Sequence, residues 1–209
     1  MPLEPDRPRA ISFFDGQNLF HSAKSAFGYK YPNYGPMRLA TRVCSDKGWS
    51  CTGVRFYTGV PDVADNKFWN HFWVAKGAQM GREGVHVFTR PLRYRNKEIK
   101  CPDGSVHTFL DGDEKGIDVR LALDVIRLAH QNEYDVALLF CRDQDLSEVA
   151  DEIRLIAKER KRWIKIASAF PFSPAFKVRG IDKTEWVHLD RATYDACLDA
   201  RDYRPKTPP

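Results

Sequence analysis

Short apolar runs alternate along the chain with longer segments whose apolar residues recur every three or four positions. The runs expected to form buried strands are 10–14, 51–59, 84–89, 136–141, 163–169 and 186–189. The segments with helical periodicity are 18–27, a stretch ending near 44, 64–80, 117–130, 146–160 and 190–198. Strands that alternate with helices predict an α/β fold with a mainly parallel central sheet.

Segment 91–110 interrupts this alternation. Residues 92–100 and 106–110 have the pattern of two strands, and Pro102-Asp103-Gly104 between them is a turn signal, so we expect an inserted β-hairpin. The remaining chain divides into a flexible N-terminus (1–9), a main domain (10–170), a C-terminal extension packed on that domain (171–202) and a disordered tail (203–209).

Composition restricts the class of protein. The 209 residues are 43% hydrophobic and 29% charged, and no stretch is long and apolar enough to span a bilayer. Five cysteines without a CxxC pair, and an N-terminus without an apolar leader segment, favour free thiols, a cytoplasmic location and no membrane partner. Paired Cys/His spacings are missing, so we expect no structural zinc. The net charge of +5 permits a nucleic-acid partner without requiring one.

Acidic residues follow three of the predicted strands. Asp15 ends the first strand, Asp143 and Asp145 follow the strand at 136–141, and Asp118 follows the hairpin at the start of a helix. Ligands of open α/β sheets bind at the carboxyl ends of the strands, so these acids are expected to meet at one edge. Clustered carboxylates repel one another unless a cation lies among them, and all-oxygen ligands favour Mg²⁺ or Mn²⁺.

Each of these acids also has a simpler structural interpretation. Asp15 suits a turn at a strand end, Asp118 is favourable in the first turn of a helix, and Asp143 or Asp145 can cap the following helix. Capping does not explain why all of them occur at strand ends, which favours a shared site.

Three further acids are given lesser roles. Asp124 lies about 240° around the helix from Asp118, so we expect a supporting or surface role for it. Asp113 and Glu114 are expected to be solvated loop charges.

Basic residues gather on the predicted hairpin, where segment 90–100 carries five bases and one acid. Arg93 and Arg95, with Tyr94 between them, suit contact with a phosphodiester backbone, although charge can also protect an edge strand from aggregation. Lys115 and Arg142 adjoin the acidic motifs and could bind a phosphate oxygen or tether a carboxylate. Aromatic residues around Trp69 and Trp73 could serve a homo-oligomer or protein interface.

Three motifs carry a family resemblance. Asp15–Asn18 has the form Asp-x-x-Asn, Lys115–Asp118 has the form Lys-Gly-x-Asp, and Cys141–Leu146 matches Ser-Gly-Asp-x-Asp-Phe at both acids. In order and spacing over about residues 10–170, the sequence resembles the NYN domain, a branch of the PIN-like nucleases. It departs from the pattern where Cys141 and Arg142 replace the usual Ser-Gly pair and Leu146 replaces Phe.

The resemblance implies a PIN-like three-layer sandwich over 10–170 and Mg²⁺- or Mn²⁺-dependent cleavage of RNA. It further implies metal ligation by Asp15, Asp118 and Asp143, with Asn18 and Asp145 in support. Asp145 would ligate the metal directly or through water. We therefore expect a ribonuclease that hydrolyses phosphodiester bonds with metal-activated water. The alternatives are a non-catalytic RNA-binding or regulatory module on the same fold and a phosphatase for small phosphomonoesters.

Overall fold

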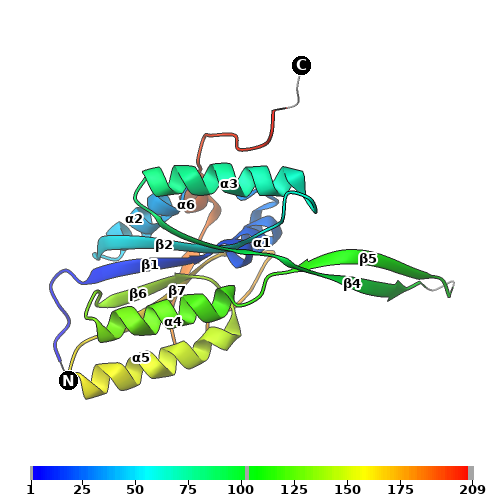
Figure 1. Cartoon of the computed structure of the whole chain (residues 1–209). Coiled ribbons are helices and arrows are strands. Elements are labelled where there is room, and N and C mark those ends of the chain that lie inside the picture. The colour runs from blue at the N-terminus through cyan, green and yellow to red at the C-terminus, as the bar shows by residue number, and fades with distance from the viewer. Residues whose placement is uncertain (1, 102–103, 207–209) are drawn as a thin grey trace.

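The central sheet consists of six strands in the order β3-β2-β1-β6-β7-β8 within the described residues, 2–101 and 104–206, of the computed structural model (Figure 1). Every neighbouring pair of strands runs parallel. The strands are β1 (Arg9–Asp15), β2 (Ser50–Val60), β3 (His86–Pro91), β6 (Val136–Phe140), β7 (Lys165–Pro171) and β8 (Glu185–Leu189). The α/β fold with a parallel sheet that the sequence predicts is confirmed.

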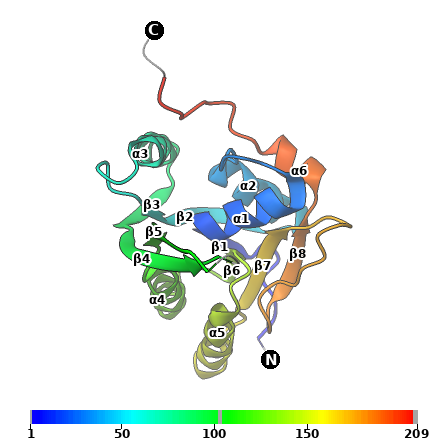
Figure 2. The ribbon, with the colours of Figure 1, turned by 90° about the vertical axis from the view of Figure 1, so that its right-hand side faces the viewer.

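Helices cover both faces of the sheet, which gives three layers (Figure 2). One face carries α1 (Gly16–Phe27), α2 (Pro36–Asp46), α3 (Lys67–Arg82) and α6 (Arg191–Ala196). The other face carries α4 (Ile117–His130) and α5 (Ser147–Glu159), and a short 3₁₀ turn, η1 (Gln144–Leu146), precedes α5. None of the helices in the described residues has the length and apolar character that crossing a bilayer requires.

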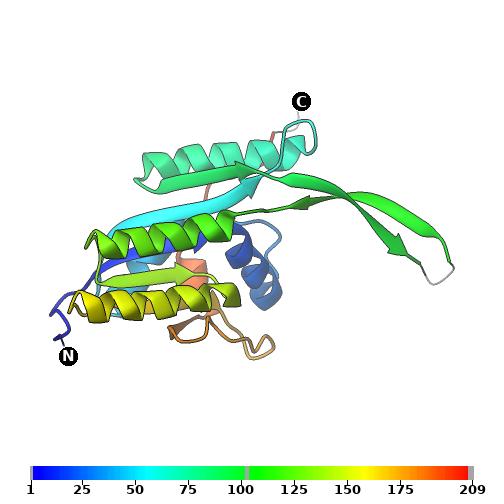
Figure 3. The ribbon, with the colours of Figure 1, turned by 60° about the horizontal axis from the view of Figure 1, so that its bottom comes forward.

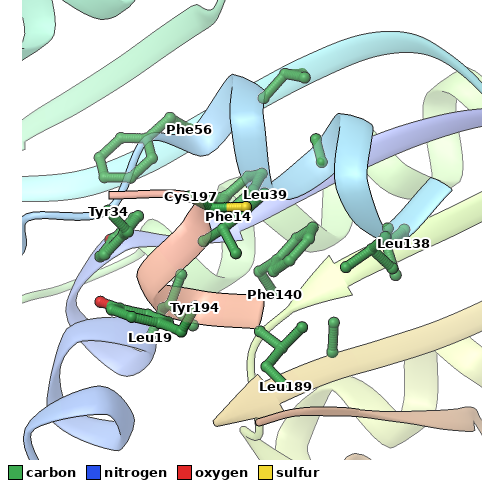
Figure 4. Close-up of a cluster of buried hydrophobic side chains, with 14 of the residues drawn as sticks. Phe14, Leu19, Tyr34, Leu39, Phe56, Leu138, Phe140, Leu189, Tyr194 and Cys197 are labelled. Carbon is green, nitrogen blue, oxygen red and sulfur yellow. The ribbon is translucent and has the colours of Figure 1, made fainter. Parts of the chain in front are cut away.

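Strand β1 is buried on both faces, as expected for a strand in the middle of a covered parallel sheet. Phe14 packs into the cluster under α1, α2 and α3, whereas Phe13 packs into the cluster under α4 and α5. Phe14 stacks on Phe140 of the neighbouring strand with ring centroids 3.9 Å apart, near the centre of the first cluster (Figure 4). This packing fixes the end of β1, and with it the position of Asp15.

The C-terminal segment completes the sheet and the first cluster. Strand β8 pairs with β7, and α6 brings Tyr194 and Cys197 into the core beside Tyr34 (Figure 4). Tyr203, the first residue of the segment expected to be disordered, is 9% exposed and packs against Phe72 with ring centroids 5.9 Å apart. This buried ring makes Tyr203 part of the packed domain, while residues 207–209 of the same segment lie outside the described residues.

The hairpin consists of β4 (Arg93–Lys100) and β5 (Val106–Asp113), which pair antiparallel. It projects from the end of the molecule where α1 begins, opposite the chain's N-terminus (Figures 1 and 3). Pro102 and Asp103 of the expected turn lie outside the described residues. Because the hairpin leaves the body at the carboxyl end of the sheet, its base borders the edge where the acidic motifs end.

The aromatic residues of α3 differ from their expected exposure. Trp73 is only 4% exposed and packs against Phe56 with ring centroids 5.9 Å apart, and Trp69 is half-buried. The ring of Trp73 covers β2 and is not available for an interface with another chain, whereas Trp69 packs against Phe20 and Tyr31.

Candidate functional site

Asp15 is the last residue of β1 and the N-cap of α1. Its Oδ1 accepts a hydrogen bond from the Asn18 backbone N–H at 2.9 Å, and the residue is 7% exposed. Burial, together with the negative charges of Asp143 and Asp118, raises the pKa of Asp15 to about 6 against the lowering effect of the cap. Asp15 therefore caps α1 and also lies close enough to Asp118 and Asp143 for their charges to raise its pKa.

Asp143 follows β6 and caps η1 by accepting the Asp145 backbone N–H at 3.1 Å. Its own backbone N–H donates to Cys141 Sγ at 3.2 Å, and the thiol of Cys141 in turn donates to Asp15 Oδ2 at 3.9 Å. Burial holds the pKa of the Cys141 thiol well above its ordinary value, so the group stays protonated. The thiol thus links the ends of β1 and β6, and Asp145 is exposed beyond them.

The connection from β5 to α4 brings in two further acids. Gly116 adopts φ 72°, a left-handed conformation that glycine tolerates, and Asp118 follows it, half-buried, in the first turn of α4. Glu114 accepts a hydrogen bond from the Gly59 backbone N–H of β2. Burial raises the pKa of Glu114 to about 8, and the charges of Asp15 and Asp118 contribute to the rise.

The expectation that Glu114 is a solvated loop charge is wrong. Its carboxyl group accepts the backbone N–H of Gly59 at the edge of the sheet, although the two residues are 55 positions apart in the sequence. The sequence placed Glu114 directly before the Lys115–Asp118 motif but held no signal for this long-range partner. The structure gives no side-chain description for Asp113.

The four carboxyl groups of Asp15, Glu114, Asp118 and Asp143 form an acidic site. The charges of Asp143 and Asp118 raise the pKa of Asp15, and the charges of Asp15 and Asp118 raise the pKa of Glu114. Among the described residues, no three His, Cys, Asp or Glu side chains already stand in metal-binding geometry. The donor set nevertheless fits a hard cation, since all four donors are carboxylates and their mutual repulsion would be relieved by positive charge.

Asn18 positions the acidic site. Its side-chain Oδ1 accepts the backbone N–H of Arg142 at 3.0 Å, which ties the first turn of α1 to the loop before Asp143. The guanidinium of Arg142 extends away along the segment between β7 and β8, where Nε donates to the Arg179 carbonyl at 3.2 Å. It also lies 5.5 Å from the ring centroid of Phe176. Its described contacts are therefore with this segment and with Ser22, and with no carboxylate.

Asp124 belongs to a separate, structural network. The residue is 2% exposed, and its carboxylate accepts hydrogen bonds from Tyr57 Oη at 2.9 Å, Arg127 at 2.9 Å and Arg120 at 3.1 Å. These contacts join α4 to β2 and lower the pKa of Asp124 despite its burial. A buried carboxylate with three donors is satisfied without a metal ion.

The basic candidates lie around the acidic site. Arg93 and Arg95 are exposed at alternate positions of β4, which places them on one face of the hairpin. Lys115 is exposed in the β5–α4 connection, directly after Glu114. The structure therefore keeps these three cations at the surface, next to or near the carboxyl edge of the sheet.

The chain matches a family model and is similar to solved structures. The model of the NYN domain matches residues 9–170. No curated protein matches the sequence. Among solved structures, a protein of unknown function, VPA0982 from Vibrio parahaemolyticus, is similar with a TM-score of 0.52 and 18% identity, over 90% of this chain and 97% of that chain. At this identity the likeness shows the fold alone.

A second solved structure, RSP in complex with β-NAD⁺ and operator DNA, is similar with a TM-score of 0.30 and 12% identity, over 91% of this chain and 53% of that chain. So low a score carries no argument. The match over residues 9–170 includes β1, the β5–α4 connection and the loop after β6, which carry the three acidic motifs. The chain therefore belongs to the NYN domain family, a branch of the PIN-like nuclease superfamily.

Proposed function

We propose that this protein is a divalent-metal-dependent ribonuclease that hydrolyses phosphodiester bonds at the acidic site. The observation that carries the proposal is the electrostatic coupling of Asp15 with Asp118 and Asp143, which come from three separate strand–helix connections. A fold that only needed helix caps at these positions would gain nothing by bringing the three carboxylates within range of one another, because like charges destabilise the buried site.

Asp15, Asp118 and Asp143 are the residues that would hold Mg²⁺ or Mn²⁺, with Glu114 as a further candidate ligand, since its pKa responds to Asp15 and Asp118, and Asp145 as an outer ligand. When bound, such an ion would activate water and neutralise charge that develops on the phosphate. Asn18 is a positioning residue, because its hydrogen bond to the Arg142 backbone fixes the loop that carries Asp143. Asp124 supports α4 from outside the site.

RNA is the proposed partner, and the hairpin is its proposed backbone track. Arg93 and Arg95 present two cations on one face of a ribbon that leaves the body at the carboxyl edge of the sheet (Figure 3). Lys115 adds a third at the base of this ribbon. Phosphate contacts of this kind supply affinity and register rather than sequence preference. The five free cysteines suit a reducing compartment, and we infer a cytoplasmic location from them.

The test is cleavage of labelled single-stranded RNA, hairpin RNA and single-stranded DNA in Mg²⁺, in Mn²⁺ and in EDTA. Asp143→Asn should abolish cleavage, because the amide keeps the capping oxygen but loses the negative charge. Glu148→Gln is the matched control, since Glu148 is an exposed acid in the first turn of α5. Circular dichroism should show both variants folded. Cleavage that survives Asp143→Asn or EDTA would refute the proposal.

A non-catalytic RNA-binding module is the second candidate. It is favoured by Cys141 and Arg142, which replace the Ser-Gly pair of the family pattern before Asp143. Salt-sensitive RNA binding without cleavage in any divalent metal would support this candidate over the nuclease.

A further inference from the structure

A cavity of about 370 Å³ lies between α1, α3 and the base of the hairpin. This volume is within the roughly 300–1,000 Å³ range of small-ligand sites. Its lining residues are Gln17, Phe20, His21, Pro61, Asn66, Trp69, Trp73, Leu92, Tyr94 and Gly112. They come from four separate parts of the chain, so the cavity exists only in the folded domain.

The cavity adjoins the acidic site. Gln17 lines it two residues after Asp15, in the first turn of α1. On the opposite side, Gly59 lies between Leu92 of the cavity and Glu114 of the acidic site. A Cβ atom built on this glycine would collide with Leu92 and lie 3.0 Å from the Glu114 carboxyl oxygen, so both side chains are in close contact with the glycine. A strand of nucleic acid crossing the acidic site would therefore pass the mouth of the cavity.

The walls offer flat aromatic surfaces and an unused hydrogen-bonding group. Trp69 and Phe20 are 6.3 Å apart between ring centroids, and Phe20 and His21 are 5.4 Å apart. The hydroxyl of Tyr94 is buried without a hydrogen-bond partner among the described residues. A buried hydroxyl without a partner costs free energy, which a ligand with a matching polar edge would recover.

The cavity suits an uncharged group. Its lining contains no Lys, Arg, Asp or Glu, and burial lowers the pKa of His21, with the charge of Lys24 adding to the effect. A pKa below 6.5 keeps the imidazole mostly neutral at pH 7. Burial raises the pKa of the Tyr94 hydroxyl, and the negative charges of Asp65 and Asp62 add to the rise, which disfavours an anionic phosphate at this position. The cations that suit phosphates lie instead on the hairpin.

We propose that this cavity binds one unpaired nucleobase of the RNA strand, adjacent to the phosphate held at the acidic site. The inference rests on the proposed function for the identity of the ligand. A planar base with a polar edge matches aromatic walls, the free Tyr94 hydroxyl and the amides of Gln17 and Asn66. Because a paired base cannot leave its duplex cheaply, the cavity makes the protein selective for unpaired RNA.

The experiment measures equilibrium binding, in EDTA, of a fluorescein-labelled unstructured 12-nucleotide RNA and of versions with one abasic residue at each position. For the wild type, one abasic position should weaken binding roughly 5- to 150-fold, the affinity equivalent of stacking one base on an aromatic side chain. Trp69→Leu should weaken binding of the intact RNA and remove the penalty of that abasic position. A flat abasic profile in the wild type would overturn the proposal.

Two further variants separate a binding effect from a folding effect. Tyr94→Phe removes only a hydroxyl that has no partner in the described structure, so it should leave the fold intact and weaken binding about fivefold. Trp186→Leu is the control for loss of an indole, since Trp186 lies on β8 and is 44% exposed. Binding unchanged in both Trp69→Leu and Tyr94→Phe would refute the nucleobase site.

The readout also separates the two proposals. Because binding is measured without metal, the abasic profile tests the cavity even if the protein never cleaves RNA. RNA cleavage with a flat abasic profile would leave the nuclease proposal intact and refute the cavity proposal. One sensitive abasic position without RNA cleavage would support the cavity proposal and refute the nuclease proposal.

Discussion

The side-chain oxygen of Asn18 accepts the backbone N–H of Arg142 at 3.0 Å, across 124 residues of sequence. In the same turn of α1, the backbone N–H of Asn18 donates a hydrogen bond to Asp15 Oδ1 at 2.9 Å. One residue thus holds the carboxylate at the end of β1 through its main chain and the loop before Asp143 through its side chain. The distance between the two acids depends on this asparagine.

Asn18→Ala should slow RNA cleavage about 10- to 100-fold with little change in RNA affinity, because it loosens the loop that carries Asp143 without removing a carboxylate. Removal of this hydrogen bond should also lower the free energy of unfolding by about 1 kcal/mol. Single-turnover cleavage and urea unfolding measure the two effects. Lys24→Ala, an exposed change on the same helix, is the control. Equal decreases in affinity and rate would contradict a positioning role.

Asp15→Asn should stabilise the protein in EDTA by about 1–2 kcal/mol, because it removes a buried charge repelled by Asp118 and Asp143 and keeps a capping oxygen. Urea unfolding at pH 7 measures the difference. Mg²⁺ should stabilise the wild type more than the variant and so reduce the difference between their free energies of unfolding. Asp46→Asn, an exposed change on α2, should have no such effect. A less stable Asp15→Asn protein would argue against a strained acidic site.

Lys76 should make stability depend on pH. The residue is fully buried on α3, where Nζ donates to the Tyr34 carbonyl at 2.8 Å. Burial lowers its pKa from 10.5 to about 8, although Asp199 and Glu83 act in the opposite direction. Between these values the unfolded chain binds more protons than the folded one, so this residue's contribution to the free energy of unfolding rises with pH.

The measurement is the difference in free energy of unfolding between the wild type and Lys76→Met. It should shift in favour of the wild type by about 2–3 kcal/mol from pH 8 to pH 10.5, the window between the folded and unfolded pKa values. Subtracting the variant removes the titration of tyrosines and cysteines common to both. Lys24→Met, at an exposed site, should show no shift, and a flat difference for Lys76→Met would show that folding does not lower the pKa of Lys76.

Removing Arg93 and Arg95 together should weaken RNA binding and make it less sensitive to salt. For each phosphate of a single strand that the protein no longer neutralises, the slope of log K against log salt becomes shallower by about 0.7. Titrations at several salt concentrations measure the slope for the double alanine variant. Arg42→Ala on α2 controls for the loss of a cation away from the hairpin, because Arg42 is exposed and paired with Asp46. An unchanged slope would remove the hairpin from the RNA path.

Local pattern was sufficient for the elements of the fold. Buried parallel strands such as β6 are continuous apolar runs, and helices such as α4 repeat apolar residues at helical spacing, so both can be predicted without the partner that covers them. The acids could also be assigned to one edge of the sheet, because all parallel strands end on the same side. Asp15, Asp118 and Asp143 were predicted in this way, and their electrostatic coupling agrees with it.

Only the tertiary structure determined which distant residues the polar and terminal side chains contact. Glu114 turned inward because Gly59 offers it a backbone N–H, Arg142 turned toward Arg179, and Asp124 became a buried ion-pair centre. Tyr203 joined the core through Phe72, and the cavity at Trp69 and Tyr94 formed from four separate segments. Sequence periodicity records which face of an element is buried, but a polar side chain's partner is set by three-dimensional packing, because the cost of burying it depends on the donor or acceptor it meets.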